Sequence, residues 1–175
     1  MRTLNNLILI GDGLQAQNIL SLIGIYYPET NVTCCSWETA QTVSISNNWS
    51  YFVGIGDNKF RNFICNRLMA AKAQLVNLNF SNTVFSNTRD TSGNLFMPNS
   101  YLSPLATIGN FSIFNTCCVV EHHSSVGDAC HIAPGATICG SVEIGNNCFI
   151  GANATVLPKT RIKSNQVVNA GSVAR

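Results

Sequence analysis

All three histidines of the chain, His122, His123 and His131, lie within ten residues of one another. A neutral imidazole is a suitable general base for an amine or a hydroxyl near pH 7. Histidines at an exposed turn commonly have no function, but their absence from the rest of the chain favours a functional cluster. Three imidazoles near a carboxylate could also bind a metal ion, although their spacing matches no common zinc pattern. We therefore predict catalytic roles for His122 and His123 and no metal site.

The sequence contains no nucleophile elbow and no Ser/His/Asp signature, the marks of an enzyme that forms a covalent intermediate. A substrate that attacks a thioester directly, while a histidine removes its proton, fits these residues better. A backbone amide near a glycine could then stabilise the oxyanion.

A hexapeptide repeat fills the second half of the chain. Every sixth residue from Phe96 to Val168 is apolar, at thirteen positions without a gap, and a mostly small residue stands two places before each. This period predicts a three-sided prism, a parallel β-helix in which each hexad supplies one short strand and one corner. Three hexads complete a coil of eighteen residues, and coils stack about 4.8 Å apart. The aliphatic residue is expected to point inward, and the small residue to fit where two walls converge.

The repeat places the histidines on different parts of the prism. His122 stands two places after an inward residue, at or near a corner, whereas His131 directly precedes the inward Ile132. The nine-residue separation is half a coil, so the two histidines cannot meet on one edge of one prism. In a threefold assembly a corner of one prism meets a face of the next. We therefore predict active sites between the subunits of a homotrimer.

The composition limits the partners and the location. Charged residues make up 10% of the 175 residues, where about 25% is usual, so we expect other subunits to cover part of the surface. The net charge of +2 and the lack of a basic run argue against nucleic acid as a partner. No apolar stretch reaches the ~18 residues of a membrane span. Eight cysteines without a CxxC pair indicate a reducing, cytoplasmic location.

Three of the cysteines have a structural interpretation. Cys118, Cys130 and Cys148 fall in the row of small inward residues, where a thiol acts as a small apolar group. We favour this role over a metal or redox role.

Residues 1–80 follow a different pattern, in which apolar strands alternate with helical spacing. We expect strands at 7–10, 31–35, 51–55 and 75–78, and helices over 14–22 and 60–68. This alternation predicts a small parallel α/β domain. Residues 81–95, rich in Asn, Ser and Thr, are then a linker, and residues 96–175 form the all-β prism.

Two glycine turns follow strands of this first domain, at 11–13 and at 54–57. Free amides and the helix dipole at such a turn favour an anion. Ala16 breaks the full GxGxxG pattern, so a plain tight turn is the alternative. Two such loops at one sheet edge favour a nucleotide site, but about 80 residues hold only half of the unit that binds a dinucleotide.

Taken together, these residues resemble the bacterial nucleotide-sugar acetyltransferases of the sialic-acid O-acetyltransferase-like group, which includes the bacillosamine-pathway N-acetyltransferases. The resemblance covers nearly the whole chain. It rests on the Gly-Asp-Gly turn, on Phe52-Val53-Gly54-Ile55-Gly56-Asp57-Asn58 with Arg61, on Asn115-Thr116, on Val120-Glu121-His122 and on His131-Ile132-Ala133-Pro134-Gly135.

The resemblance implies a left-handed β-helix, a trimer with acetyl-CoA bound between neighbouring prisms, and a nucleotide sugar held by the first domain. It implies that His122 is the general base and that the Gly140 amide faces the thioester oxygen. The other implied contacts are to acetyl-CoA at His131, Ala152 and Ala170, and to the nucleotide sugar at Gly11, Gly13, Leu14, Gln15, Gly56 and Asn115.

The chain departs from the family pattern at two places. The family usually has Asp or Glu directly after the catalytic histidine, where this chain has His123. A second imidazole supplies no fixed negative charge, so either the base is weaker, or Glu121 or Asp128 takes the role, or His123 shares it. Leu14-Gln15 stands where the family usually has Gly-His.

We therefore predict an acetyl-CoA-dependent N-acetyltransferase that acts on an amino group of a UDP-linked amino sugar. Two alternatives stay open. One is an O-acetyltransferase on a sialic-acid-like sugar, which differs only in the acceptor. The other is a non-catalytic hexapeptide-repeat scaffold.

Overall fold

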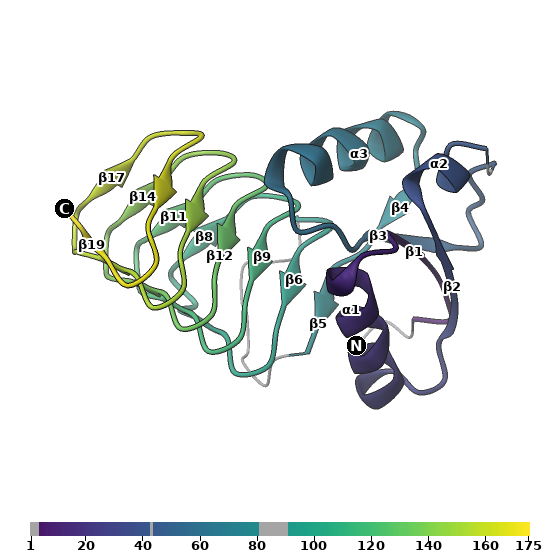
Figure 1. The fold of residues 1–175 in the computed structure, drawn as a ribbon, viewed down its shortest axis with the longest axis horizontal. Coiled ribbons are helices and arrows are strands. Elements are labelled where there is room, and N and C mark those ends of the chain that lie inside the picture. The colour runs from purple at the N-terminus through teal and green to yellow at the C-terminus, as the bar shows by residue number, and fades with distance from the viewer. Residues whose placement is uncertain (1–3, 43, 81–90) are drawn as a thin grey trace. The chain divides into compact units, whose positions relative to one another are not determined.

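The computed structural model describes residues 4–42, 44–80 and 91–175. They form two compact units, of which the first ends at Val76 and the second begins at Asn77 (Figure 1). The predicted combination of an α/β unit and an all-β unit of stacked parallel strands is confirmed. In the described part of the chain, no helix is long and apolar enough to cross a membrane.

Unit 1 is a parallel sheet with the strand order β2-β1-β3-β4. Its first strand is the apolar run that the sequence indicated, and Leu7 and Leu9 are fully buried. Buried residues at helical spacing, such as Ile19 and Ile23, give the first helix an apolar face. The elements are β1 (Asn6–Ile10), α1 (Leu14–Tyr26), β2 (Asn31–Cys35), α2 (Trp37–Ala40), β3 (Ser50–Val53), α3 (Asn58–Ala70) and β4 (Gln74–Leu75).

The strand expected at 75–78 is divided between the two units. Leu75 lies in β4 of unit 1, whereas Leu78 begins β5 (Leu78–Asn79) of unit 2. The Leu78 N–H donates to the Asn94 carbonyl, and the Phe80 N–H donates to the Phe96 carbonyl. Residues 77–80 are thus part of unit 2, although we placed the end of the first domain at residue 80. Of the predicted linker 81–95, residues 81–90 lie outside the described residues.

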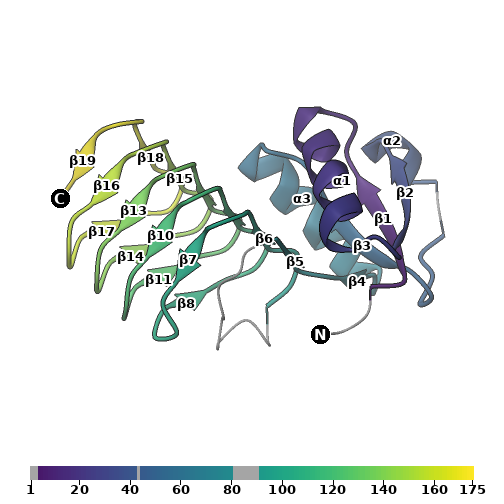
Figure 2. The same cartoon turned by 90° about the horizontal axis from the view of Figure 1, so that it is seen from below.

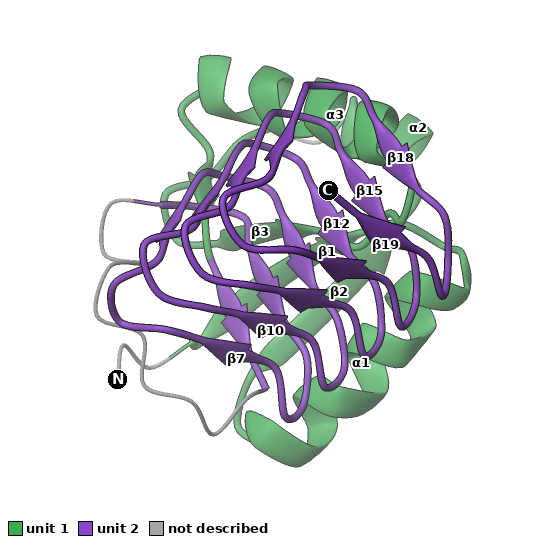
Figure 3. Ribbon diagram, turned by 90° about the vertical axis from the view of Figure 1, so that its left-hand side faces the viewer, with its two compact units in different colours: residues 1–76 green, residues 77–175 purple. Residues whose placement is uncertain are grey.

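Unit 2 consists of two-residue strands that stack in three parallel sheets (Figure 2). We call them the β10 wall (β7, β10, β13, β16, β19), the β11 wall (β8, β11, β14, β17) and the β12 wall (β5, β6, β9, β12, β15, β18). Each strand pairs with the strands eighteen residues before and after it, as predicted; His131, for example, pairs with Ile113 and Phe149. Figure 3 shows this unit in purple.

The strands of unit 2 after β5 have the following bounds. They are β6 (Leu95–Phe96), β7 (Tyr101–Leu102), β8 (Thr107–Ile108), β9 (Ile113–Phe114), β10 (Val119–Val120), β11 (Ser125–Val126), β12 (His131–Ile132), β13 (Thr137–Ile138), β14 (Glu143–Ile144), β15 (Phe149–Ile150), β16 (Thr155–Val156), β17 (Arg161–Ile162), β18 (Val167–Val168) and β19 (Val173–Ala174).

The two inward rows of the repeat form the core of unit 2. Val120 and Ile132 from the aliphatic row are fully buried, as are Cys118, Cys130 and Cys148 from the small row. Burial raises the pKa of the Cys118 thiol to about 12, so this thiol stays protonated at neutral pH. At Cys148 the hydrogen bond with the Cys130 thiol instead lowers the pKa to about 7. The burial of all three side chains supports their interpretation as packing groups.

The corners of the coil have a backbone feature that the spacing did not reveal. The second residue of nearly every corner turn has a positive φ, including His123 at 60° and Asn165 at 63°. This is the conformation that a type II turn requires at its third position. The stacked coils impose it even on residues that favour it poorly, such as Phe111.

Val167 and Val168 of β18 offer a test of the inward rows. Val168 points inward and is 8% exposed, whereas Val167 is 66% exposed. Val168→Ala should lower the free energy of unfolding by about 1.5–2.5 kcal/mol, because two buried methyl groups are lost. Val167→Ala removes the same groups from the same strand and should cost less than about 0.5 kcal/mol. Equal losses in urea denaturation would contradict the inward assignment.

Candidate active site

His122 and His123 lie on the turn that leads from β10 to β11. Their Nδ1 atoms are 2.9 Å apart, which is a hydrogen-bond distance, and the planes of the two rings are nearly perpendicular, at 85°. Both side chains are exposed. The structure therefore brings the two predicted catalytic residues together as a hydrogen-bonded pair.

Gly140 lies one coil after His122 at the same corner, which we call the histidine corner. A Cβ atom on Gly140 would come within 2.8 Å of the His122 Cε1 atom and 3.0 Å of its Nε2 atom. The imidazole thus occupies the space that any side chain at position 140 would need. Within the described part of the chain, the Gly140 N–H donates to no other group. The residue that lies against the His122 ring therefore has an unused backbone donor.

Within one chain, Asp128 does not pair with His122. It lies at the next corner, on the turn between β11 and β12, and its Oδ1 accepts the Asn110 N–H at 2.7 Å. The same bond recurs in the following coils, because the Asp128 N–H donates to Asn146 and the Asn146 N–H donates to Ser164. Asp128 thus belongs to a ladder that joins successive coils, and we call this corner the ladder corner.

Glu121 also fails to supply a partner for the base. Among the described residues, its carboxylate makes no hydrogen bond and no ion pair. The partner of the His122 Nδ1 atom is the imidazole of His123.

His131 lies on β12 and is held by Asn115. The Asn115 Oδ1 accepts the Thr116 N–H at 2.8 Å, which leaves the amide nitrogen facing the His131 Nε2 atom at 3.1 Å. An amide nitrogen can only donate, so Nε2 accepts and the proton of the neutral ring lies on Nδ1. The ring also packs edge-on against Phe149, with centroids 5.1 Å apart. These contacts suit a residue that binds a ligand rather than one that moves a proton through Nε2.

Ala152 and Ala170 lie at the third corner, which joins the β12 wall to the β10 wall and which we call the alanine corner. The Gly171 N–H donates to the Ala152 carbonyl and so links the two turns. The β10 wall separates this corner from the histidine corner. Within one chain, the predicted acetyl-CoA residues therefore fall into two sets: Gly140 lies with His122, and Ala152 and Ala170 lie at another edge.

In unit 1 the two glycine turns lie side by side. The Gly54 N–H donates to the Ile10 carbonyl, and a Cβ atom on Gly11 would come within 3.0 Å of the Gly54 carbonyl oxygen. Gly13 caps α1 without a side-chain hydrogen bond, so backbone N–H groups of the first turn remain available to an anion. In the same turn the Gln15 Nε2 atom is buried and has no hydrogen-bond partner among the described residues.

Arg61 holds the second glycine turn in place through hydrogen bonds. Its side chain is 1% exposed and donates to the carbonyl oxygens of Ile55 and Gly56, both at 3.0 Å, and to the Asn58 side chain at 2.7 Å. The guanidinium therefore fixes the loop that contains Gly56. Arg61 formed part of the motif in the sequence, but its spacing alone gave it no role.

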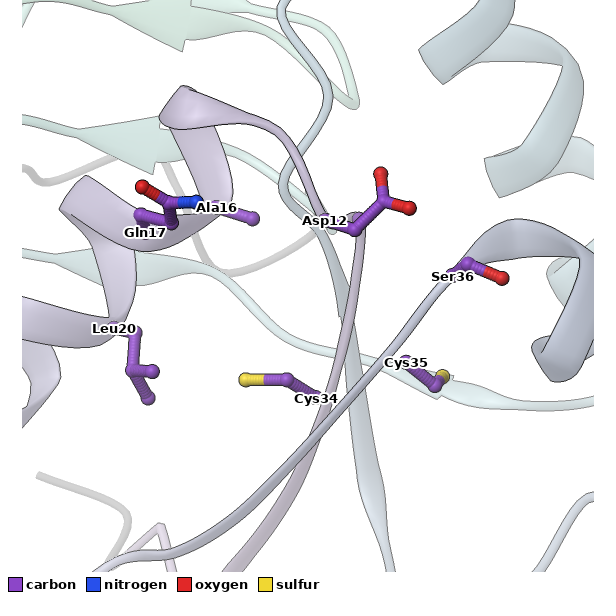
Figure 4. A pocket seen from close by; sticks show the side chains of 8 residues that line it. Asp12, Ala16, Gln17, Leu20, Cys34, Cys35 and Ser36 are labelled. Carbon is purple, nitrogen blue, oxygen red and sulfur yellow. The ribbon is translucent and has the colours of Figure 1, made fainter.

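A hollow of about 290 Å³ opens beside the first glycine turn (Figure 4). The thiol of Cys34 points toward Leu20 across it. Of the predicted substrate residues, Gly11 lines this hollow, whereas Gly13, Leu14, Gln15 and Gly56 do not. The other lining residues were not predicted from the sequence: they are Asp12, Ala16, Gln17, Leu20, Cys34, Cys35 and Ser36. They come from the turn after β1, from α1 and from the end of β2, which no single spacing in the sequence connects.

No group of three or more His, Cys, Asp or Glu residues in 4–42, 44–80 and 91–175 is arranged to hold a metal ion.

Comparison with known proteins identifies the repeat. Residues 123–158 match the family of the bacterial transferase hexapeptide, in its form with six repeats. The matched residues all lie in unit 2. The match includes His123, His131 and Gly140 and stops before the last coil.

Solved structures match nearly the whole chain. A variant of perosamine N-acetyltransferase from Caulobacter crescentus, in complex with CoA and GDP-perosamine, is 23% identical; the match covers 98% of this chain and 89% of that one, with a TM-score of 0.81. The acetyltransferase domain of PglB from Neisseria gonorrhoeae is 20% identical over 98% of this chain and 91% of its own, with a TM-score of 0.86. In complex with acetyl coenzyme A, the same domain matches with 22% identity, 95% and 89% coverage and a TM-score of 0.81.

At these identities the matches establish a shared fold, which extends over both units. The predicted resemblance to bacterial nucleotide-sugar acetyltransferases is confirmed at that level. The fold and the repeat are consistent with an acyltransferase.

The contact between Gly140 and His122 can be tested by Gly140→Ala. The added methyl group should displace the imidazole, because it would lie 2.8 Å from Cε1. The chain has three histidines, so their ring signals in NMR spectra are easily resolved, and those of His122 should shift while those of His131 stay in place. Gly24→Ala is the matched control, since a Cβ atom there meets nothing within 4 Å. An unchanged His122 signal in Gly140→Ala would contradict the contact.

Arg61→Met tests the support of the second loop. The variant leaves carbonyl oxygens of the loop without their donor, which should lower the free energy of unfolding by about 1–3 kcal/mol. Arg67→Met is the control on the same helix. Arg67 stacks over Trp37 and Phe63 at 5.9 and 5.7 Å, and its loss should cost less than about 1 kcal/mol. Urea denaturation measures both, and a larger loss in Arg67→Met would refute the assignment.

Proposed function

We propose that the protein transfers an acetyl group from acetyl-CoA to an amino group of a nucleotide-linked sugar. The observation that carries this proposal is the histidine corner. There a general base, His122, lies over a glycine, Gly140, whose N–H is unused. A base and an oxyanion donor at one point are what acyl transfer by direct attack requires.

The proposed step uses each of these groups once. The sugar amine attacks the carbonyl carbon of the thioester, and its proton passes to the Nε2 atom of His122. The Gly140 N–H donates to the oxygen that becomes negative. The bond between carbon and sulfur then breaks, and the leaving thiolate takes up the proton from His122, which gives the thiol of CoA and restores the neutral base.

Unit 1 is proposed to hold the nucleotide sugar. The uncapped start of α1 and the loop that Arg61 supports lie together at the carboxyl ends of β1 and β3, where parallel α/β sheets bind ligands. Negative phosphates suit this place because of the helix dipole. The hollow beside Gly11 is close in size to a small-ligand pocket. Gly13, Leu14, Gln15 and Gly56 remain proposed contacts to the substrate, and the donor at Gln15 Nε2 is available for it.

The division of the prism residues into two sets supports a homotrimer with sites between subunits. His122 and Gly140 lie at one corner, whereas Ala152 and Ala170 lie at another, with His131 and Asn115 on the adjoining wall. If all of them contact acetyl-CoA and the sugar, the two sets must come from different copies. We propose that the subunits assemble around a threefold axis and that the enzyme works in the cytoplasm.

The release of thiol from acetyl-CoA tests this function. We expect release with a nucleotide-linked 4-amino sugar and none with acceptors that offer only hydroxyl groups. Both UDP- and GDP-linked sugars should be tried: we propose the UDP form, whereas the matched perosamine N-acetyltransferase is in complex with GDP-perosamine. His122→Ala should reduce turnover by about 10²–10⁴-fold, the usual contribution of a general base, without changing the melting temperature or the oligomeric state.

Two results would redirect the proposal. Release with hydroxyl acceptors alone would indicate an O-acetyltransferase. A folded protein that binds no acetyl-CoA would indicate a scaffold. Asn165→Ala, at an exposed corner turn, is the control for effects of substitution on the coil.

A further inference from the structure

The hydrogen-bond partner of the proposed base, His122, is the imidazole of His123. The position of the shared proton therefore decides whether His122 can act as a base. The contact between the Nδ1 atoms of His122 and His123 is 2.9 Å long. Two nitrogen atoms at this distance need one proton between them, so one ring donates and the other accepts. Two tautomeric arrangements are therefore possible, and they differ in which ring can act as a base.

The arrangement that leaves His122 active has its proton on Nδ1. His122 then donates to His123, and its Nε2 atom keeps a free electron pair. In the opposite arrangement His123 donates to the Nδ1 atom of His122, which places the His122 proton on Nε2 and blocks that atom as a base.

The two arrangements also respond differently when His122 takes up a proton. If His122 already donates through Nδ1, a second proton at Nε2 leaves the contact intact and makes it charge-assisted, which strengthens it. In the opposite arrangement a proton taken up by His122 must go to its Nδ1 atom, the only nitrogen of that ring without one, so both nitrogens of the contact would carry protons and the contact would break. Only the first arrangement therefore stabilises the cationic state that His122 passes through as a general base.

We infer that His123 is a positioning residue that holds His122 in its Nδ1–H tautomer and accepts a hydrogen bond from it during the reaction. This inference rests on the proposed function and names the residue that does the work of the missing carboxylate. Neither alternative bonds His122 in the described part of the chain: Asp128 is bonded to Asn110 at the ladder corner, and the Glu121 carboxylate makes no hydrogen bond.

The backbone keeps His123 in place for this role. Its φ of 60° is close to that of Ser141 and Lys159, which hold the same position in the next two coils, at 60° and 64°. Asn and Asp share with His a raised tolerance for this conformation. Aspartate can therefore replace His123 without strain and still offer an oxygen as an acceptor, whereas alanine offers none.

The test compares tautomers by ¹⁵N NMR of the histidine rings near neutral pH, in perdeuterated protein labelled at histidine. The wild type should show His122 with its proton on Nδ1. His123→Ala should lose that signal and turn over acetyl-CoA about 10- to 100-fold more slowly, the rate equivalent of one charge-assisted hydrogen bond. His123→Asp should restore the Nδ1–H signal and return activity to within about tenfold of the wild type.

Asn165→Ala makes the corresponding change at another left-handed corner position, with a φ of 63°, and should leave both readouts unchanged. A wild-type His122 that carries its proton on Nε2, or one whose tautomer is the same in His123→Ala, would overturn the inference. The spectra need no substrate. The tautomer result therefore stands or falls separately from the proposed function, which fails if no acceptor is acetylated.

Discussion

The parallel register of eighteen residues is the constraint on which the rest of unit 2 depends. Each two-residue strand bonds to the strands one coil away, so every side chain lies directly over the residue eighteen places later. His122 therefore contacts Gly140, and His131 contacts Phe149, although the two residues of each pair are eighteen positions apart in the sequence. A side chain at a corner is bounded above and below by the same position of neighbouring coils. The chemistry of a corner is thus a property of a column of residues and not of a single turn.

The arrangement of residues in these columns could be predicted from the sequence, because the six-residue period defines it. The inward rows, the buried cysteines and the position of His122 at a corner all follow from that spacing. The positive φ at His123 could not be read in the same way, since the corresponding position holds Phe, Cys, Ala, Ser, Lys, Asn or Gly. The bond between the two imidazoles depends on rotamers that the stack allows. The contact of Asn115 with His131 joins residues sixteen apart, a separation that no six-residue pattern marks.

Unit 1 was predicted less completely, for a different reason. Its longer buried strands can be recognised in the sequence as apolar runs. By contrast, β4 and the following β5 have two residues each, which is too short to show any periodicity. The run Leu-Val-Asn-Leu at 75–78 therefore read as one strand, although its two ends belong to different units. The hollow beside Gly11 was missed because its wall includes Cys34, Cys35 and Ser36, which lie at the end of a separate strand, β2. Residues that meet through sheet order are not visible in linear spacing.

The ladder corner and the histidine corner use their polar side chains differently. At the ladder corner, Asn110, Asp128 and Asn146 each accept or donate a bond to the next coil, so their polar groups are committed to stability. At the histidine corner the same column reads Pro104, His122, Gly140 and Pro158, and no such ladder joins these side chains in the described part of the chain. Backbone bonds hold the coils together there, as from Ser141 to His122. The ladder corner thus carries the side-chain hydrogen bonds between coils. At the histidine corner the two imidazoles bond each other instead. This pair is not needed to join the coils, so it can serve a catalytic role.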